Sequence, residues 1–354
     1  MKHAVLWAEN KMQKDLKRKS IKQKITLNEF ASEFFTSKDP HNFRLRNEKR
    51  NRRYFDDYYY RHQGRLNNYI FPQFGQYLME SISDVMIEDW LLTLKSYRNP
   101  AKDLADDSKN KILECMRMVF QEAKRQGYIT NNPAREVQLI NVEGESRKTF
   151  SELELFQMFP KNEEELLRIW QSRMWAVYFL IMRDTGFRPG EVAGLTLGSY
   201  NPQYKGIYTE QSIHHATRKV IKRIKTTGKG KNYKVGLLTN QTIEQLNKLI
   251  EEQDIKDRDG LLFLLEGRPL IPETANKHLK LSLRRTEVKL NGRTQYCLRH
   301  AFETALAGKV EEKVLLELMA HKSFRKEYDH RTPEDLFKQL QPAWEVIEKR
   351  TMMQ

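Results

Sequence analysis

The chain has 354 residues, of which 39% are hydrophobic, and carries a formal net charge of +15 with a pI of about 9.5. This apolar content can form the cores of two ordinary domains and excludes a wholly disordered chain. The excess of positive charge favours a polyanionic partner, either nucleic acid or an anionic membrane face. The longest apolar run, WAVYFLIM, is far shorter than the roughly 20 residues of a membrane span, so we expect nucleic acid.

The cysteines and the N-terminus add little to this picture. Cys115 and Cys297 are the two cysteines, and their contexts have no metal-type spacing, so neither a disulfide nor a zinc site is expected. The N-terminal MKHAVLWAENK lacks an apolar segment followed by a small-residue cleavage site. We therefore expect a cytoplasmic protein in a reducing compartment, with no metal and no membrane partner.

The first half of the sequence is basic and helical. Ser83 or Asp84 can cap a helix that begins VMIEDW, and Asp107 or Ser108 can cap a longer helix that Gly127 ends. Cations decorate this longer helix away from its apolar stripe, and we expect them to contact DNA. They are Lys109, Lys111, Arg117, Lys124 and Arg125.

The second half mixes helices with short strands. Ser151 and Glu154 form a capping box for a new helix, and QSRMWAVYFLIMRDTG is a helix that ends at Gly186. GIYTEQSI, TRKVIKRIKTT and YKVGLL are predicted to be short antiparallel strands, and helices return in TIEQLNKLIEEQ and ETANKHLKLSLRRTEV. The predicted fold class is mainly α with a small antiparallel β-sheet.

Two segments of the second half contain arginines suited to holding a phosphate. DTGFRPGEVAGLTL places Arg188 at a turn that opens a helix, with Glu191 on the same face and able to hold the guanidinium. YCLRHAFET places Tyr296 and Arg299 at the start of an apolar helix face. From each segment alone, an ordinary surface arginine is the competing interpretation.

Two further segments contain a lysine-rich hairpin and an isolated tyrosine. IKTTGKGKNYKVGLL carries Lys225, Lys229 and Lys231, and a lysine at such a hairpin tip can reach a nucleic-acid groove or simply solubilise the turn. LLELMAHKSFRKEYDH runs from an apolar helix into His321 and then Tyr328, the last tyrosine of the chain.

In this order, the segments resemble the conserved boxes of the tyrosine recombinase (phage integrase) family. TGFRPGEVAGLTL matches the box of the first arginine, LRHAFET the box of the second arginine, and LMAH the leucine-methionine-glycine-histidine box with alanine in place of glycine. The resemblance covers about residues 150–335, and RLNNYIFPQFG and KNKILECMRMVFQEAKRQGYITNNPA are similar to the core-binding domain of the family. It implies an N-terminal helical core-binding domain plus an α+β tyrosine-recombinase catalytic domain.

The resemblance also implies a domain order. In chain order we expect a basic N-terminal segment (1–24), a helical core-binding DNA-binding domain (25–140), a linker (141–150), a catalytic domain (151–335) and a C-terminal helix or tail (336–354). Two placements of the tail stay open, packing within the chain or docking on a neighbouring protomer.

The implied activity is site-specific DNA recombination that integrates or excises a mobile element. Tyr328 would attack a DNA phosphodiester and form a 3′-phosphotyrosine link, while Arg188 and Arg299 would hold the negative charge that develops on the phosphate. His321 would donate to the same phosphate or help to manage the phenolic proton, and no metal or other cofactor is implied.

Five more residues receive roles. Lys225, with Lys229 as the alternative, would protonate the leaving 5′-oxygen, and Lys229 and Lys231 would contact DNA. Tyr296 stands where the family usually has a histidine, and Glu191 would support Arg188. The implied partners are double-stranded DNA with specific attachment sites, a homotetramer on that DNA, and accessory DNA-bending or directionality factors.

Two rival functions stay open at this point. A catalytically decayed site-specific DNA-binding protein is suggested by Tyr296, by Ala320 in the histidine box, and by the short separation of His321 and Tyr328. A type IB topoisomerase would use the same chemistry to relax supercoils without strand exchange.

Overall fold

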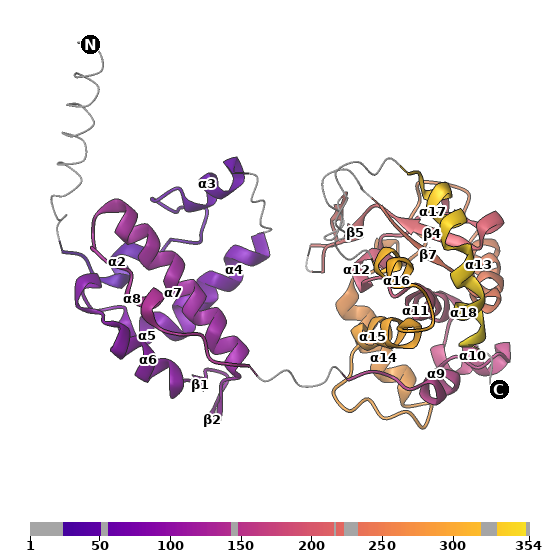
Figure 1. Cartoon of the computed structure of the whole chain (residues 1–354), viewed down its shortest axis with the longest axis horizontal. Coiled ribbons are helices and arrows are strands. Elements are labelled where there is room, and N and C mark those ends of the chain that lie inside the picture. The colour runs from indigo at the N-terminus through magenta and orange to yellow at the C-terminus, as the bar shows by residue number, and fades with distance from the viewer. Residues whose placement is uncertain are drawn as a thin grey trace, which may run out of the picture. The chain divides into compact units, whose positions relative to one another are not determined.

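The computed structural model describes residues 24–50, 56–142, 148–215, 217–222, 233–319 and 331–351. The chain divides into two compact units, Met1–Gly144 and Glu145–Gln354 (Figure 1). Both units are mainly helical, and the strands form small antiparallel sheets, which confirms the predicted fold class. Among the described residues, no helix is both long and apolar enough to cross a bilayer.

In its described residues, unit 1 is helical with one small hairpin. Its helices are α2 (Leu27–Ala31), α3 (Phe43–Lys49), α4 (Asp56–Arg65), α5 (Phe71–Phe74), α6 (Asp84–Leu92), α7 (Asp106–Gln126) and α8 (Pro133–Glu136). A π-helix, η1 (Leu66–Ile70), joins α4 to α5. A hairpin of β1 (Lys95–Ser96) and β2 (Asn99–Asp103) lies between α6 and α7.

The long helix α7 contributes much of the core of unit 1. Its predicted stripe, which includes Ile112 and Val119, is buried among the side chains of the other helices. Gly127 ends the helix at φ 82°, a left-handed conformation that costs glycine little, as predicted. The predicted N-caps were wrong: α7 begins at Asp106 after Ala105, so both aspartates at its start lie in the first turn, where the helix dipole stabilises carboxylates.

The described part of unit 2 contains ten α-helices and the main sheet. The helices are α9 (Glu152–Met158), α10 (Glu163–Trp170), α11 (Arg173–Thr185), α12 (Pro189–Ala193), α13 (Asn240–Glu252), α14 (Pro272–Leu283), α15 (Tyr296–Leu306), α16 (Glu312–Leu318), α17 (Pro333–Leu340) and α18 (Trp344–Lys349). The sheet has the antiparallel order β3 (Tyr200–Asn201), β4 (Gly206–Thr209), β7 (Lys234–Leu237). Two hairpins pair β5 (Ser212–Ile213) with β6 (Val220–Ile221) and β8 (Leu264–Leu265) with β9 (Arg268–Pro269).

Helix α11 lies in the middle of unit 2, in contact with α13, α15 and β7 (Figure 1). Every residue from Met174 to Thr185 is buried, as expected for a helix that is covered on all sides. The capping box of Ser151 and Glu154 opens α9 as predicted, and Gly186 ends α11 at φ 59°. The end of α11 therefore lies deep in the unit, next to the start of α12.

Strand β7 is covered on both faces. Val235 and Leu237 belong to a core cluster shared with α15, α16 and α17. On the opposite face, Gly236 lies so close to Thr185 that an added Cβ would stand 2.6 Å from its methyl group. Because side chains alternate along a strand, Lys234 shares the face of Gly236 and points toward the junction of α11 and α12.

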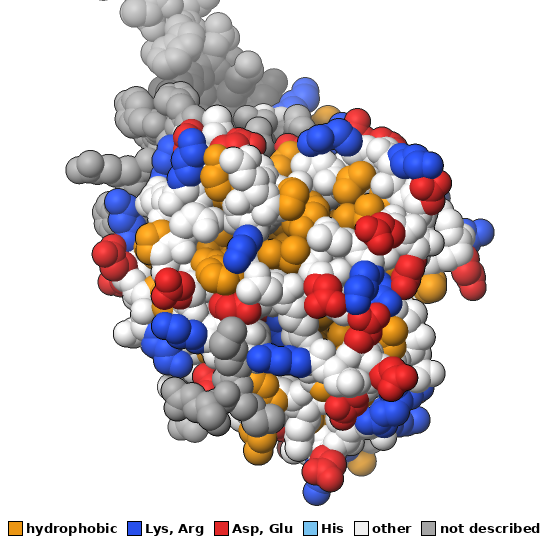
Figure 2. Space-filling model, turned by 90° about the vertical axis from the view of Figure 1, so that its right-hand side faces the viewer, with side chains coloured by type: hydrophobic (Ala, Val, Ile, Leu, Met, Phe, Trp, Pro, Cys, Tyr) orange, Lys and Arg blue, Asp and Glu red, His pale blue; other side chains and the backbone are white. Residues whose placement is uncertain are grey.

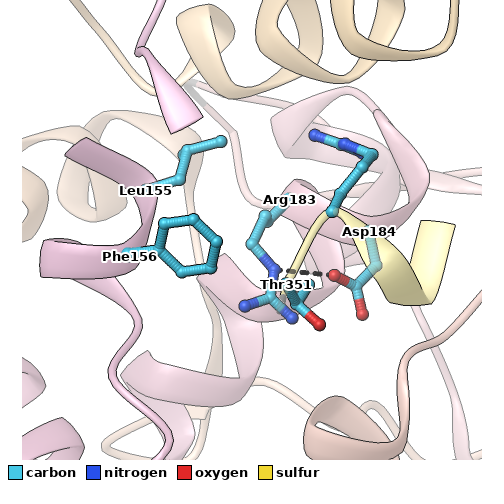
Figure 3. A pocket seen from close by; sticks show the side chains of 6 residues that line it. Leu155, Phe156, Arg183, Asp184 and Thr351 are labelled. Carbon is cyan, nitrogen blue, oxygen red and sulfur yellow. Dashed lines mark hydrogen bonds and ion pairs between the residues drawn. The ribbon is translucent and has the colours of Figure 1, made fainter. Parts of the chain in front are cut away.

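The described part of the tail packs on its own unit. Thr332 caps α17 with Pro333 in the first turn, and the Phe337 ring lies on Gly206 of β4, where an added Cβ would come within 2.3 Å of it. Arg350 and Thr351 line a cavity of about 10 Å³, across which Leu155 and Phe156 of α9 face Arg183 and Asp184 of α11 (Figure 3). This volume holds no more than about one water molecule, so the cavity is not a ligand site.

Candidate active site

The turn between α11 and α12 fixes Arg188. Gly186 ends α11, Pro189 begins α12, and Arg188 is the N-cap between them. The backbone N–H of Arg188 donates to Glu191 Oε2 at 2.8 Å, and its Nη1 donates to Glu191 Oε1 at 2.9 Å. Glu191 is only 2% exposed, so this is a partly buried pair and not an ordinary surface ion pair.

Arg299 reaches the same turn from α15. Its guanidinium is buried, with Nη1 donating to the carbonyl of Gly186 and Nη2 donating to the carbonyl of Met319 at 3.0 Å. Burial lowers the pKa of Arg299 below its ordinary value, and the nearby positive charge of Arg188 lowers it further. The two arginines that the sequence singled out therefore lie close together, both bonded to the segment Gly186–Glu191.

Tyr296 lies one helical turn before Arg299 on α15 and is 48% exposed. The covering of part of its ring raises the pKa of Tyr296 above its ordinary value, against the opposite effect of the Arg188 charge. The phenol therefore stays protonated at neutral pH and can donate a hydrogen bond to a ligand beside the arginines.

Lys234 of β7 was missed by the sequence analysis. Its Nζ lies 3.4 Å from Glu191 Oε2 and 3.5 Å from the Gly186 carbonyl, and it stands 4.5 Å from the centroid of the Phe187 ring. Burial lowers the pKa of Lys234 to about 7, and the charges of Arg299 and Arg188 act in the same direction. The alternation in YKVGLL does separate Lys234 from Val235 but does not reveal that both faces of the strand are buried.

Glu191 is the carboxylate that contacts both Arg188 and Lys234. Burial acts to raise the pKa of Glu191, but the positive charges of Lys234 and Arg188 outweigh it, so the pKa lies below its ordinary value. The carboxylate stays ionised and partly balances the surrounding cations. The site is therefore a cluster of cations partly balanced by Glu191, and its arginines are suited to bind an anion such as a phosphate.

The cations predicted to bind DNA on α7 have different surroundings. Lys109 is 8% exposed and its Nζ donates to the Leu92 carbonyl at 3.0 Å, which ties α7 to α6. Arg117 donates to the carbonyls of Ala134 and Val137 at 2.9 and 2.6 Å, which ties α7 to α8 and the residue after it.

The other three cations of α7 remain at the surface. Lys111 pairs with Asp107 and Arg125 pairs with Glu122. Lys124 is exposed in the last turn of the helix. Of the five, these three are therefore in a position to meet a phosphate.

Several predicted site residues lie outside the described residues: Lys225, Lys229, Lys231, His321 and Tyr328. The described residues that flank 320–330 both contact the neighbourhood of α16. Met319 accepts from Arg299 through its carbonyl, and Arg331 pairs with Glu317 at 3.3 Å. Met319, the last described residue before the segment that contains His321 and Tyr328, is therefore bonded directly to Arg299.

The face of unit 2 that includes α13 has mixed charge. Figure 2 shows Lys and Arg interspersed with Asp and Glu, with apolar side chains between them. Ion pairs account for part of this balance, including Arg173 with Glu163 and Lys248 with Glu244. This face lacks the continuous positive surface expected of a DNA-binding face. Within the described ranges, no cluster of three or more His, Cys, Asp or Glu could hold a metal ion.

Comparisons with known proteins give the same fold. The integrase of the Tn1549 transposon in complex with transposon right end DNA superposes with a TM-score of 0.61 at 16% sequence identity, covering 90% of this chain and 99% of that chain. A lambda integrase dimer bound to a COC′ core site gives a TM-score of 0.57 at 16% identity, covering 82% and 97%. A lambda integrase tetramer bound to a Holliday junction gives 0.54 at 18%, covering 91% and 88%.

The comparisons of sequence cover less of the chain than the comparisons of structure. No curated protein matches the chain. The model of the phage integrase family matches residues 151–333, which is more than half of the chain and spans both arginine boxes. The chain therefore belongs to the phage integrase family of tyrosine recombinases.

Proposed function

We propose that this protein is a site-specific DNA recombinase that cuts and rejoins duplex DNA through a 3′-phosphotyrosine at Tyr328, and so integrates or excises a mobile element. The observation that carries the proposal is the convergence of Arg188 and Arg299, from two different helices, on the segment Gly186–Glu191. Two planar guanidiniums that meet at one segment suit a phosphate whose negative charge increases in the transition state.

The proposed chemistry uses these two arginines and the residues expected beside them. The Tyr328 oxygen attacks the phosphorus and passes its proton to His321, and the bond between the phosphorus and the 5′-oxygen breaks. Lys225, with Lys229 as the alternative, gives that oxygen a proton. Tyr296 donates to a non-bridging oxygen. The new ester keeps the energy of the broken one, so a 5′-hydroxyl can reverse the step without ATP.

The proposed partners are duplex DNA with specific attachment sites and three further copies of the chain. The dimer and tetramer of lambda integrase on DNA support this, as does the Tn1549 integrase on transposon-end DNA. Lys111, Lys124 and Arg125 on the surface of α7, with Lys229 and Lys231, are the proposed phosphate contacts. Accessory DNA-bending or directionality factors belong to the same proposal.

The test is a duplex that contains a candidate attachment site from DNA next to the gene, with a nick close to the cleavage position. The nick lets the short 5′-hydroxyl strand diffuse away, so the covalent protein–DNA adduct accumulates and is seen as a shifted band on a denaturing gel. We expect an adduct from the unaltered protein and from Tyr60→Phe, whose tyrosine is 79% exposed, and none from Tyr328→Phe.

The other outcomes separate the rival functions. Specific binding without an adduct would mean that the protein binds its site but does not cut it. An adduct with relaxation of supercoils, but without exchange between two cognate sites, would indicate a topoisomerase.

A further inference from the structure

Lys234 makes unusual contacts for a lysine on a β-strand. It is 2% exposed on a strand that is covered on both faces, and its ammonium contacts one carboxylate oxygen and one carbonyl oxygen. Placing a charged ammonium away from water is costly unless nearby groups compensate, and both acceptors here come from a single turn. A purely structural position on this strand would be filled at lower cost by an apolar side chain.

Each acceptor of Lys234 also holds one of the two arginines. Glu191 Oε2 lies 3.4 Å from the lysine and accepts from the Arg188 backbone, while Oε1 of the same carboxylate accepts from the Arg188 guanidinium at 2.9 Å. The Gly186 carbonyl lies 3.5 Å from the lysine and accepts from Arg299 Nη1. Lys234 thus connects to Arg188 through Glu191 and to Arg299 through the Gly186 carbonyl. We call these two connections its branches.

We propose that Lys234 is a positioning residue for DNA cleavage, which fixes the separation and orientation of the Arg188 and Arg299 guanidiniums through Glu191 and the Gly186 carbonyl. The inference rests on the proposed function, because it assigns a role within that reaction. The buried ammonium does not reach the surface, so Lys234 acts through the arginines and not by touching DNA.

Among the described residues, the charged groups that act on Lys234 are Glu191 on α12, Arg188 at the N-cap of α12, and Arg299 on α15. Its pKa of about 7 means that the ammonium loses its proton across the neutral range. Below pH 7 the charged form holds both acceptors strongly. Above pH 7 the neutral amine holds them less well, so the contribution of Lys234 to cleavage declines as the pH rises.

The experiment compares Lys234→Met with the unaltered full-length protein on the nicked duplex described above. Methionine keeps most of the length of the side chain and removes the ammonium. We expect the single-turnover cleavage rate at saturating DNA to fall roughly 10²-fold, the scale of a misplacement of about 1 Å at a reacting centre. The dissociation constant for the uncut duplex should stay the same, because Lys234 does not touch DNA.

The pH profile separates positioning from a general structural role. We expect the ratio of the unaltered rate to the Lys234→Met rate to be largest below pH 7 and to decline above it, because other ionisations cancel in the ratio. A ratio that does not vary with pH would overturn the proposal. The control is Lys248→Met, which removes another glutamate-paired lysine of unit 2, on α13, and should leave rate and profile unchanged.

A second pair of variants covers the case in which Lys234→Met fails to fold because Glu191 is left as a buried charge. Glu191→Gln removes that charge, and Lys234→Met in this background still breaks the branch to Gly186 and Arg299. We expect a further loss of at least roughly tenfold in cleavage rate. No further loss would overturn the role of that branch.

The result also distinguishes this inference from the proposed function. If the unaltered protein forms no adduct, the proposed function is wrong. If it forms the adduct and Lys234→Met forms it at the same rate, the function stands and the role of Lys234 is wrong.

Discussion

At the scale of single residues, Gly186 shows why one position can require glycine for more than one reason. It ends α11 in the left-handed region at φ 59°, and its carbonyl accepts from Arg299 and lies next to Lys234. A Cβ at this position would also stand 2.7 Å from the Phe302 ring of α15. Glycine is therefore required here both by the backbone conformation and by the space beside the second arginine helix.

We expect Gly186→Ala to destabilise unit 2 and to slow cleavage. An alanine in the left-handed region costs about 1–2 kcal/mol. The clash with Phe302 adds about 1–3 kcal/mol, since a well-packed core must shift to admit an extra methyl group. Thermal unfolding measures the loss of stability and the nicked duplex measures the loss of rate.

Gly308→Ala provides the matched control. Gly308 has φ 73°, and an added Cβ there would meet nothing within 4 Å. It therefore carries the backbone cost without the clash, and its cleavage rate should not change. Equal losses in stability from the two variants would mean that Phe302 moves aside easily.

Arg299 offers a second test at this scale. We expect Arg299→Lys to keep DNA binding and to lose cleavage by roughly 10²–10³-fold, the effect of removing one preorganised donor from a developing oxyanion. A lysine has a point charge and cannot hold Gly186, Met319 and a phosphate with one planar group. Filter binding and single-turnover cleavage are measured on the same duplex. If binding falls as much as cleavage, Arg299 only holds the DNA backbone.

At the scale of elements, helix ends that depend on neighbouring residues were predicted well. The burial of an element by residues far away in the sequence was not. The capping box of Ser151 and Glu154 and the helix stop at Gly127 depend on residues within about one turn, so the sequence contains them. The hairpin of β1 and β2 has no strong turn signal and was not predicted. The strand of Lys234 was predicted, but its burial depends on α12, α15 and α17, which lie far away in the sequence.

The packing of α17 can be tested by itself. The Phe337 ring is fully buried on the sheet, and we expect Phe337→Ala to lower the free energy of unfolding of unit 2 by about 3–5 kcal/mol. Leu281→Ala is the control, because Leu281 is 47% exposed on α14 and should cost little. Denaturant unfolding of the DNA-free protein measures both. A small effect for Phe337→Ala would mean that α17 leaves this position in solution, as a tail docked on a neighbouring protomer would.

At the scale of the whole molecule, the charge of +15 is unevenly available to a partner. Some cations hold the fold together, such as Lys109 and Arg117 in unit 1 and Lys234 in unit 2. Others are paired in a balanced surface, as on the face that includes α13. Net charge therefore predicts the class of partner, whereas the contact surface depends on which cations remain exposed.

This distinction predicts the salt dependence of DNA binding. Each phosphate that is neutralised by a lysine or arginine releases counterions, so 6–10 contacts lose about 10³–10⁵ in affinity between roughly 50 and 200 mM salt. We expect a loss of this size for a duplex attachment site, measured by fluorescence anisotropy.

Lys124→Gln should reduce the slope of log affinity against log salt concentration by about one contact, because Lys124 is exposed on α7. Lys109→Met should lower the stability of unit 1 and leave the slope unchanged, because that ammonium is buried against α6. If the slope changes in the Lys109 variant and not in the Lys124 variant, the DNA binds another face of unit 1. If the affinity of the unaltered protein does not change with salt, the protein does not make an extended set of phosphate contacts.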